Sequence, residues 1–169
     1  MALADFAFLP EKPHHDAAIE AINDEAFGPG RFVKAAYHIR EDGPHERDLS
    51  FVALSGEEVV GSVRLTRIAA GEGRGLLLGP LAVRPAFKNI GIGKRLVAIA
   101  LDAARASGHG LVVLVGDAPY YGPLGFSRVP AGQLSMPRPV DAARLLACEL
   151  TPGKLDAFRG VVRHAALAQ

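Results

Sequence analysis

The feature that most constrains the fold is an apolar strand pattern that is broken in its middle. Residues 76–83 read Leu-Leu-Leu-Gly-Pro-Leu-Ala-Val, and proline cannot donate to a sheet ladder, so the break marks an edge or a bulge. An amphipathic helical pattern over 91–106 follows, and then the apolar, β-branched run Leu111–Val115. Strand, helix and strand in this order predict a crossover connection between the two strands.

The other segments place this unit inside a mixed α/β or α+β fold. Apolar spacing and turn residues predict helices over 14–27, 32–39 and from 151 onward, strands over 51–54, 59–68 and 145–150, and a turn over 69–75. The chain has 169 residues and no internal repeat, so we expect a single domain over residues 1–169.

Composition argues against several classes of protein. The longest uncharged apolar run, Leu96–Leu101, falls far short of the roughly 20 residues that span a membrane. There is no signal-peptide pattern and Cys148 is the only cysteine, so we expect a cytoplasmic protein without an internal disulfide. The histidines have no metal-ligand company, which predicts no metal. Basic residues are not interleaved with aromatic ones and tryptophan is absent, which argues against a nucleic-acid partner.

Charge is distributed unevenly along the chain. Residues 1–60 contain 12 acidic and 5 basic residues, whereas residues 61–169 contain 6 acidic and 14 basic residues. No acid lies between Glu72 and Asp102, a stretch that contains five basic residues. Such a stretch either suits a polyanionic ligand or is an ordinary solvated face.

The glycines in this stretch exclude two nucleotide-binding devices by their spacing. A P-loop needs Ser or Thr after its Gly-Lys pair, but Gly93-Lys94 is followed by Arg95. A dinucleotide-binding turn needs G-x-G-x-x-G directly after a strand, but position 96 is leucine and seven residues separate Val83 from Gly91. What remains is G-x-G at a helix N-terminus, where unpaired N–H groups and the helix dipole favour phosphate.

Two stretches of the chain resemble the GNAT superfamily of acetyl-CoA-dependent N-acetyltransferases. Leu81–Leu96 is similar to its acetyl-CoA-binding motif V-x-P-x-x-[QR]-x-x-G-[IV]-G-x-x-L, with Lys88 where glutamine or arginine is usual. Gly116–Phe126 is similar to the variant G-D-x-x-Y-Y-x-x-x-G-F of a bacterial branch. The resemblance implies a mostly antiparallel central sheet that is flanked by helices and splayed at the fourth and fifth strands.

The resemblance also implies an acyltransferase reaction and its site. An acetyl group would pass from acetyl-CoA to a primary amine by direct attack, and Tyr121, with Tyr120 as its substitute, would protonate the departing thiolate. The implied acetyl-CoA-binding residues are Leu81, Ala82, Val83, Lys88, Asn89, Gly91, Ile92, Gly93 and Lys94. The alternative is a non-catalytic acyl-CoA sensor with the same fold, which has no need of a placed acid; a homodimer is allowed.

The general base and the acceptor amine stay open. Asp24, Glu25, His38 and Glu46 are candidates for the base, although each is individually typical of a solvated surface residue. The acidic first third of the chain is suited to attract a cation, and by analogy with the family the helix over 32–39 would border the acceptor site. Polyamines, aminoglycosides, amino acids and protein N-termini all fit this description.

Overall fold

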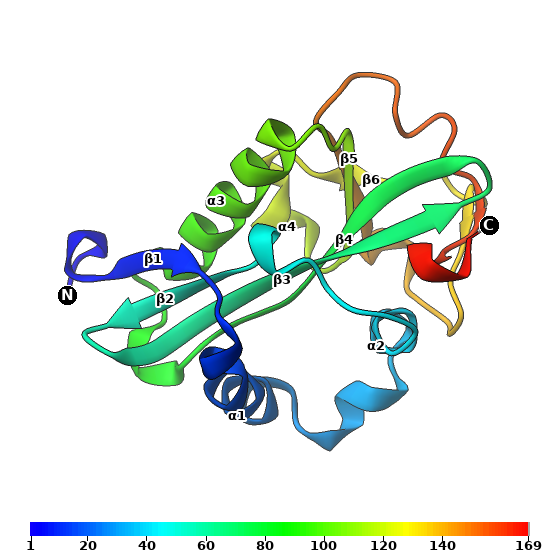
Figure 1. Cartoon of the computed structure of the whole chain (residues 1–169). Coiled ribbons are helices and arrows are strands. Elements are labelled where there is room, and N and C mark those ends of the chain that lie inside the picture. The colour runs from blue at the N-terminus through cyan, green and yellow to red at the C-terminus, as the bar shows by residue number, and fades with distance from the viewer. Residues whose placement is uncertain (169) are drawn as a thin grey trace.

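The computed structural model describes residues 1–168. A sheet of eight strands runs in the order β1-β2-β3-β4-β5-β8-β6, with β10 on β3, and a separate pair is formed by β7 and β9 (Figure 1). The strands are β1 Ala7–Pro10, β2 Phe51–Ser55, β3 Glu58–Ala70, β4 Gly73–Val83, β5 Leu111–Val115, β6 Ser127–Arg128, β7 Leu134–Ser135, β8 Leu145–Glu149, β9 Gly160–Val161 and β10 Arg163–His164. In the large sheet the described pairs are antiparallel except β4–β5.

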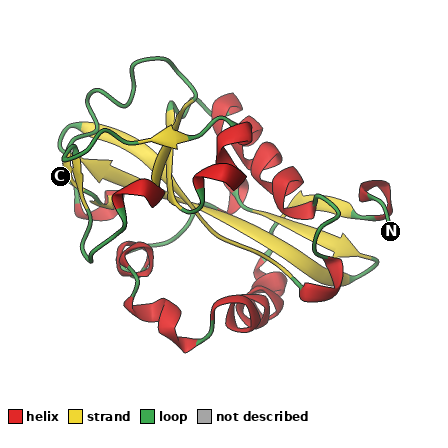
Figure 2. Ribbon diagram, turned by 180° about the vertical axis from the view of Figure 1, so that it is seen from behind, coloured by secondary structure: helices red, strands yellow, loops and turns green. Residues whose placement is uncertain are grey.

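Helices cover both faces of the large sheet. The helix α3 (Ile92–Ala106) lies on one face, and α1 (Asp16–Phe27) and α2 (Ala35–Arg40) lie on the other (Figure 2). The short α4 (Ala118–Tyr121) follows β5. The apolar stripe of α3, which includes Leu96 and Val97, is fully buried against the sheet. Burial of this stripe, rather than helix propensity, holds α3 in place.

The two parallel strands separate at the broken strand pattern. Leu76 and Leu77 of β4 pair with β5, but β4 continues without this partner to Val83. On its other side, β3 pairs with β4 on both sides of a register shift, so that Arg64 alone lies opposite Gly79 and Pro80. Two residues facing one make a β-bulge. The predicted break and the splayed mixed sheet are therefore confirmed.

The elements predicted from α1 to β8 are present in the predicted order, with one turn wrong in extent, while α4, β6 and β7 were not predicted. The turn expected over 69–75 spans only two residues, because β3 runs to Ala70 and β4 begins at Gly73. Of the three glycines that suggested a turn, Gly71 lies in it, whereas Gly73 and Gly75 lie inside β4, where the backbone around Phe158 approaches Gly73 and Leu111 approaches Gly75. A glycine in a strand marks close approach of another backbone as readily as a turn. The N-terminal strand β1 was not predicted.

The helix predicted from residue 151 is wrong. Residues 152–157 form turns, and β9 and β10 follow. Gly153 and Gly160 have φ angles of 88° and 97°, which a right-handed helix does not contain. Phe158 and Val162, whose spacing suggested the helix, are nevertheless buried at 0% and 1% exposure, in the apolar cluster that also holds Ile39 of α2.

Replacing Phe158 with alanine should lower the free energy of unfolding by about 3–5 kcal/mol, because the side chain is fully buried and leaves a cavity. Urea unfolding measures the loss. Val161→Ala, a change in the neighbouring exposed residue, is the control and should change stability by less than about 0.5 kcal/mol. A loss below about 1 kcal/mol for Phe158→Ala would contradict this packing.

Candidate active site

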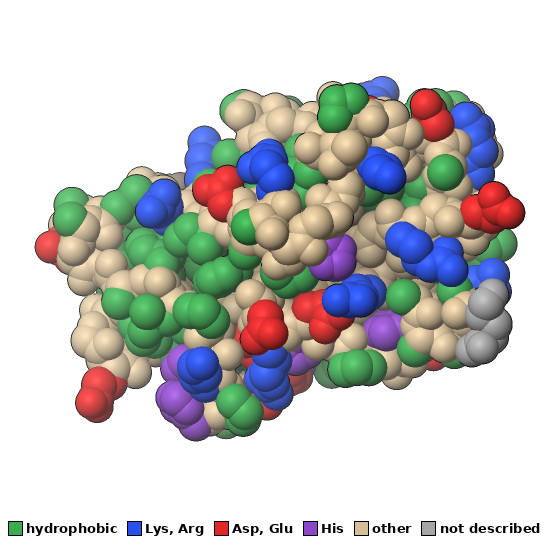
Figure 3. Space-filling view, turned by 45° about the horizontal axis from the view of Figure 1, so that its top comes forward, with side chains coloured by type: hydrophobic (Ala, Val, Ile, Leu, Met, Phe, Trp, Pro, Cys, Tyr) green, Lys and Arg blue, Asp and Glu red, His purple; other side chains and the backbone are tan. Residues whose placement is uncertain are grey.

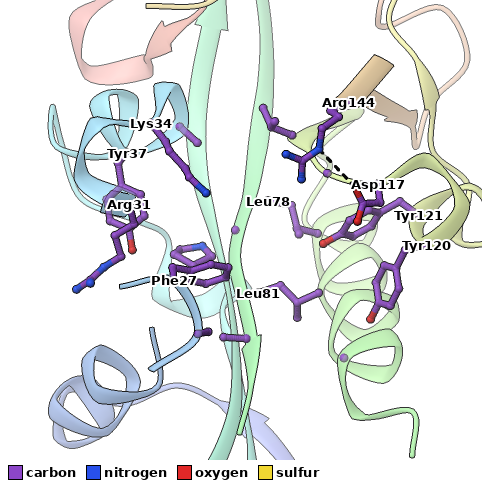
Figure 4. A pocket seen from close by; sticks show the side chains of 18 of the residues that line it. Phe27, Arg31, Lys34, Tyr37, Leu78, Leu81, Asp117, Tyr120, Tyr121 and Arg144 are labelled. Carbon is purple, nitrogen blue, oxygen red and sulfur yellow. Dashed lines mark ion pairs between the residues drawn. The ribbon is translucent and has the colours of Figure 1, made fainter. Parts of the chain in front are cut away.

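A cavity of about 1170 Å³ lies where β4 and β5 diverge (Figure 4). It is bounded by β4 and the 87–94 turn, by the end of β5 with α4, and by residues 31–40 and 138–144. All ten residues implied by the motifs line it: Leu81, Ala82, Val83, Lys88, Asn89, Gly91, Ile92, Gly93, Lys94 and Tyr121. The structure thus brings the two motif regions, which are distant in sequence, to one space.

The N-terminus of α3 opens into this cavity with no side-chain cap. Gly91 is the N-cap residue, with a φ of 97° that glycine adopts without strain. The preceding Asn89 has a φ of 65°, a conformation that asparagine tolerates better than most residues. The side chain of Ile92 is buried in the core, so this residue offers its backbone to the cavity. The first-turn N–H groups are donors without side-chain partners and favour an anion.

The free edge of β4 forms a second wall. Arg84 N–H donates to the Val60 carbonyl of β3 at 2.8 Å. Backbone groups alternate in direction along a strand, so Ala82 also faces β3 while the N–H and C=O of Leu81 and Val83 face the open side. Because β5 has turned away at that level, these groups are available to pair with an extended ligand.

Tyr120 and Tyr121 stand on α4 opposite this edge. Their rings meet edge to face at 4.8 Å. Figure 4 shows the Tyr121 hydroxyl pointing across the cavity toward β4. The Tyr120 hydroxyl instead lies against Gly93 of α3. A Cβ atom added to that glycine would be only 2.6 Å from the hydroxyl oxygen. Burial raises the pKa of Tyr121 to about 12 and also raises the pKa of Tyr120, so both phenols keep their protons at neutral pH.

The charged residues that line the cavity are mainly basic. Seven basic side chains reach it against two carboxylates, Asp117 and Asp141. The basic residues are Arg31, Lys34, Arg40, Lys88, Lys94, Arg138 and Arg144. Arg144 pairs with Asp117 at 3.4 Å (Figure 4). The helix over 32–39 was expected to border the acceptor site, and residues of α2 do line the cavity. The 138–144 segment was not identified from the sequence, because it is distant from the motifs.

None of the four candidates for the general base lines this cavity. Asp24 pairs with Arg31, and Glu25 lies 3.9 Å from Arg84. His38 accepts a hydrogen bond from Arg138 at 3.0 Å, and Glu46 pairs with Arg67. The three carboxylates among these candidates therefore lie beside arginines, and no acidic residue of the first third lines the cavity.

A buried ion-pair network fastens the start of α1 to β3. Glu11 is 3% exposed and binds Arg64 at 2.9 Å, Arg47 at 2.8 Å and His45 at 2.8 Å. Burial of the Glu11 carboxyl raises its pKa, but hydrogen bonds from His45 and Arg64 outweigh burial and leave the pKa below its ordinary value. The network thereby holds His45 and Arg47 of the 41–48 loop in place.

Three further observations concern the surface charges, possible metal ligands and the length of the helices. On the face in Figure 3, Lys and Arg side chains are interspersed with Asp and Glu, and apolar side chains gather toward the N-terminal end. Within residues 1–168, no three His, Cys, Asp or Glu side chains gather in a way that would hold a metal ion. Over the same residues, every helix is too short or too polar to cross a membrane.

The model of the acetyltransferase (GNAT) family matches residues 16–126, which include the cavity walls formed by β4, α3 and α4. The chain belongs to this family. Its GNAT membership confirms the resemblance seen in the sequence and makes the protein an acyltransferase.

Relatives in Escherichia coli cover most of the chain. The chain is similar to the uncharacterized N-acetyltransferase YjhQ of strain K12, with 29% identity over 143 residues, 82% of this chain and 78% of YjhQ. It is also similar to the uncharacterized N-acetyltransferase YhbS of the same strain, with 27% identity over 158 residues, 91% of this chain and 93% of YhbS.

Solved structures show the same fold. The crystal structure of YhbS from Escherichia coli in complex with CoA has a TM-score of 0.80 at 24% identity and covers 95% of this chain and 89% of YhbS. A GNAT family acetyltransferase from Brucella melitensis in complex with acetyl-CoA has a TM-score of 0.65 at 24% identity, covering 87% of this chain and 89% of its own.

The Glu11 network predicts acid-sensitive stability. A carboxyl whose pKa is lowered on folding stabilises the protein above its ordinary pKa of 4.5 and loses that contribution as the pH falls further. Glu11→Gln should therefore cost about 1–3 kcal/mol at neutral pH, because it leaves Arg47 and Arg64 to share the single carboxylate of Asp16, and should lose less additional stability than the wild type below pH 4.5.

Urea unfolding at several pH values measures both effects. Glu57→Gln, in the exposed turn between β2 and β3, is the matched control and should follow the wild type throughout. An identical acid dependence for Glu11→Gln and the wild type would contradict the role of the network.

Proposed function

We propose that this chain transfers the acetyl group of acetyl-CoA directly to a primary amine. The neutral amine nitrogen attacks the thioester carbonyl, an amide bond forms as the carbon–sulfur bond breaks, the nitrogen gives up one proton, and the departing thiolate takes one up. Holding both reactants in one cavity supplies much of the rate, since good geometry is worth effective molarities of about 10⁵ M or more. The cavity of about 1170 Å³ has room for both.

The observation that carries this proposal is the joining of an anion site and an open strand edge in one cavity. The uncapped N-terminus of α3, with Lys88 and Lys94 beside it, suits a pyrophosphate. The free backbone groups of Leu81 and Val83 suit the amides of a pantetheine arm. The CoA complex of YhbS and the acetyl-CoA complex of the Brucella melitensis protein support the same ligand for this fold.

Tyr121 is the proposed acid. Its hydroxyl faces β4 across the cavity (Figure 4), where an acyl group held by the β4 edge would lie. Its pKa of about 12, raised by burial, keeps the proton available but makes full transfer to a thiolate of pKa about 8.5 uphill. The positive charge of Arg144 lowers the pKa of Tyr121 and so makes the proton transfer to the thiolate less uphill. Tyr120 is the substitute.

Acetyl-CoA and CoA should each stabilise the protein against heat. A ligand at 100 times its Kd adds about 2.7 kcal/mol to the free energy of unfolding, which a thermal-shift titration detects. NAD is the control nucleotide and should give a far smaller shift. Absence of a shift with both CoA species would refute the proposal. Release of free thiol over an amine panel then distinguishes an enzyme from a non-catalytic sensor.

Tyr121→Phe should lower kcat by about 10²–10⁴-fold, the usual effect of losing a general acid, while the Kd for acetyl-CoA stays unchanged. Steady-state thiol release and isothermal titration measure the two quantities. Tyr120→Phe is the matched variant on the neighbouring ring. A larger loss of kcat in Tyr120→Phe would assign the acid to Tyr120, and unchanged turnover in both would remove the tyrosine acid from the mechanism.

A further inference from the structure

A small recess of about 170 Å³ lies beside the main cavity, on the face of the sheet that α1 and α2 cover. The two spaces share Tyr37, Arg40, Gly79 and Pro80 as walls. The recess therefore adjoins the bulge of β4, directly before the free strand edge. Nothing in the transfer chemistry described above uses it.

Three side chains of the recess bring unsatisfied polar atoms to it. Asn23 Oδ1, Arg40 Nε and Thr66 Oγ1 are buried and have no hydrogen-bond partner within residues 1–168. Asn23 and Thr66 are only 3% and 1% exposed. Buried polar groups without partners are costly and uncommon, so three around one small space indicate that the space receives a polar group.

Arg40 is the decisive member of this set. The titratable groups that act on its guanidinium are Tyr37, whose phenol is neutral at neutral pH, and the like charge of Arg64, with no carboxylate among them in the described chain. Burial lowers the pKa of Arg40 to about 10, which still leaves it charged at neutral pH. Its Cζ lies 5.1 Å from the Tyr37 ring centroid. The guanidinium is thus held by packing, while its charge remains uncompensated.

The other charges at the recess are already paired. Arg64 is bound by Glu11 and Asp16, and Glu20 is bound by Arg31. Arg40 therefore leaves one net positive charge at this place. A guanidinium binds a carboxylate through two parallel hydrogen bonds. The Thr66 hydroxyl is a further neutral donor, whereas Asn23 Oδ1 is an acceptor. One cation with a neutral hydroxyl donor matches a monoanion.

The position of Arg40 sets the distance to the reacting amine. A Cβ built on Gly79 would lie 2.5 Å from Arg40 Nη2, so the guanidinium rests on the bulge. Leu81, where the open edge begins, is two residues further along, roughly 6–7 Å of strand. A carboxylate on Arg40 and an amine at that edge are spanned by a short amino acid.

We propose that the acceptor is an α- or β-amino acid whose carboxylate is bound by Arg40, with the Thr66 hydroxyl as the second donor of the subsite. This inference rests on the proposed function, since it names the acceptor class of that reaction. It replaces the cationic acceptor that the acidic first third of the chain suggested.

Matched pairs of acceptors test it. The panel contains the L-amino acids and β-alanine, each with its primary amide, and the readout is kcat/KM from thiol release with acetyl-CoA. At least one acid should exceed its amide by about 10- to 150-fold, the range of a hydrogen-bonded charge. Arg40→Met should abolish that ratio and Arg40→Lys should keep part of it, with the Kd for acetyl-CoA unchanged in both.

Two further variants separate binding from folding. Thr66→Val removes a hydroxyl that has no partner, so it should leave stability intact while raising KM for the acids alone by about 3- to 10-fold. Arg105→Gln, an exposed arginine paired with Asp102, is the matched control and should keep the wild-type ratio. If Arg40→Met lowers kcat/KM equally for the acids and the amides, Arg40 has a structural role and the subsite is overturned.

The outcomes also distinguish this inference from the proposed function. If acetyl-CoA binds but amides are acetylated as fast as acids, or no acid is acetylated, the carboxylate subsite is overturned and acetyl-CoA-dependent transfer stands. If a phosphorylated amine such as O-phosphoethanolamine is preferred over every carboxylate, the class of acceptor is wrong. If neither acetyl-CoA nor CoA binds, the proposed function fails first.

Discussion

The separation of β4 from β5 is the constraint on which the rest of the structure depends. Their pairing stops after Leu77, so β4 carries a free backbone edge into the interior of the molecule. Unpaired backbone groups are tolerated only where water or a ligand satisfies them. The bulge at Gly79 and Pro80 bends β4 at this point, and the cavity, the start of α3 and α4 are all arranged around the resulting gap.

Charge pairing decides which part of this cavity attracts which ligand. The acidic residues of α1 lie near the cavity in the fold, but Arg31 binds Glu20 and Asp24, and Glu25 lies 3.9 Å from Arg84. Pairing removes their net field, and cations dominate what the cavity presents. Net charge along a sequence segment thus describes its solubility better than its binding site, because the partners of each charge are set by the tertiary fold.

The sequence was sufficient for the features that depend on neighbours in the chain. The break in β4 and the glycine turn before α3 were recognisable because turn geometry and helix capping are local. The paired tyrosines were singled out by the resemblance of their motif to the family. The spacing of Phe158 and Val162 was recognised as apolar but was wrongly assigned to a helix, because burial was achieved by an irregular segment. Arg40 escaped prediction because its importance arises from packing on Gly79, thirty-nine residues away in the chain.

The two walls of the cavity differ in how strongly their chemistry depends on the amino-acid sequence. The wall made by β4 and the start of α3 acts through backbone groups, which many sequences provide once the glycines and the bulge are kept. The opposite wall acts through side chains, among them Arg40 and, beyond the family match that ends at residue 126, Arg138 and Arg144. A side chain changes chemistry with one substitution, whereas a backbone edge does not. Acceptor choice is therefore expected to vary among proteins that share this fold while the backbone wall stays the same.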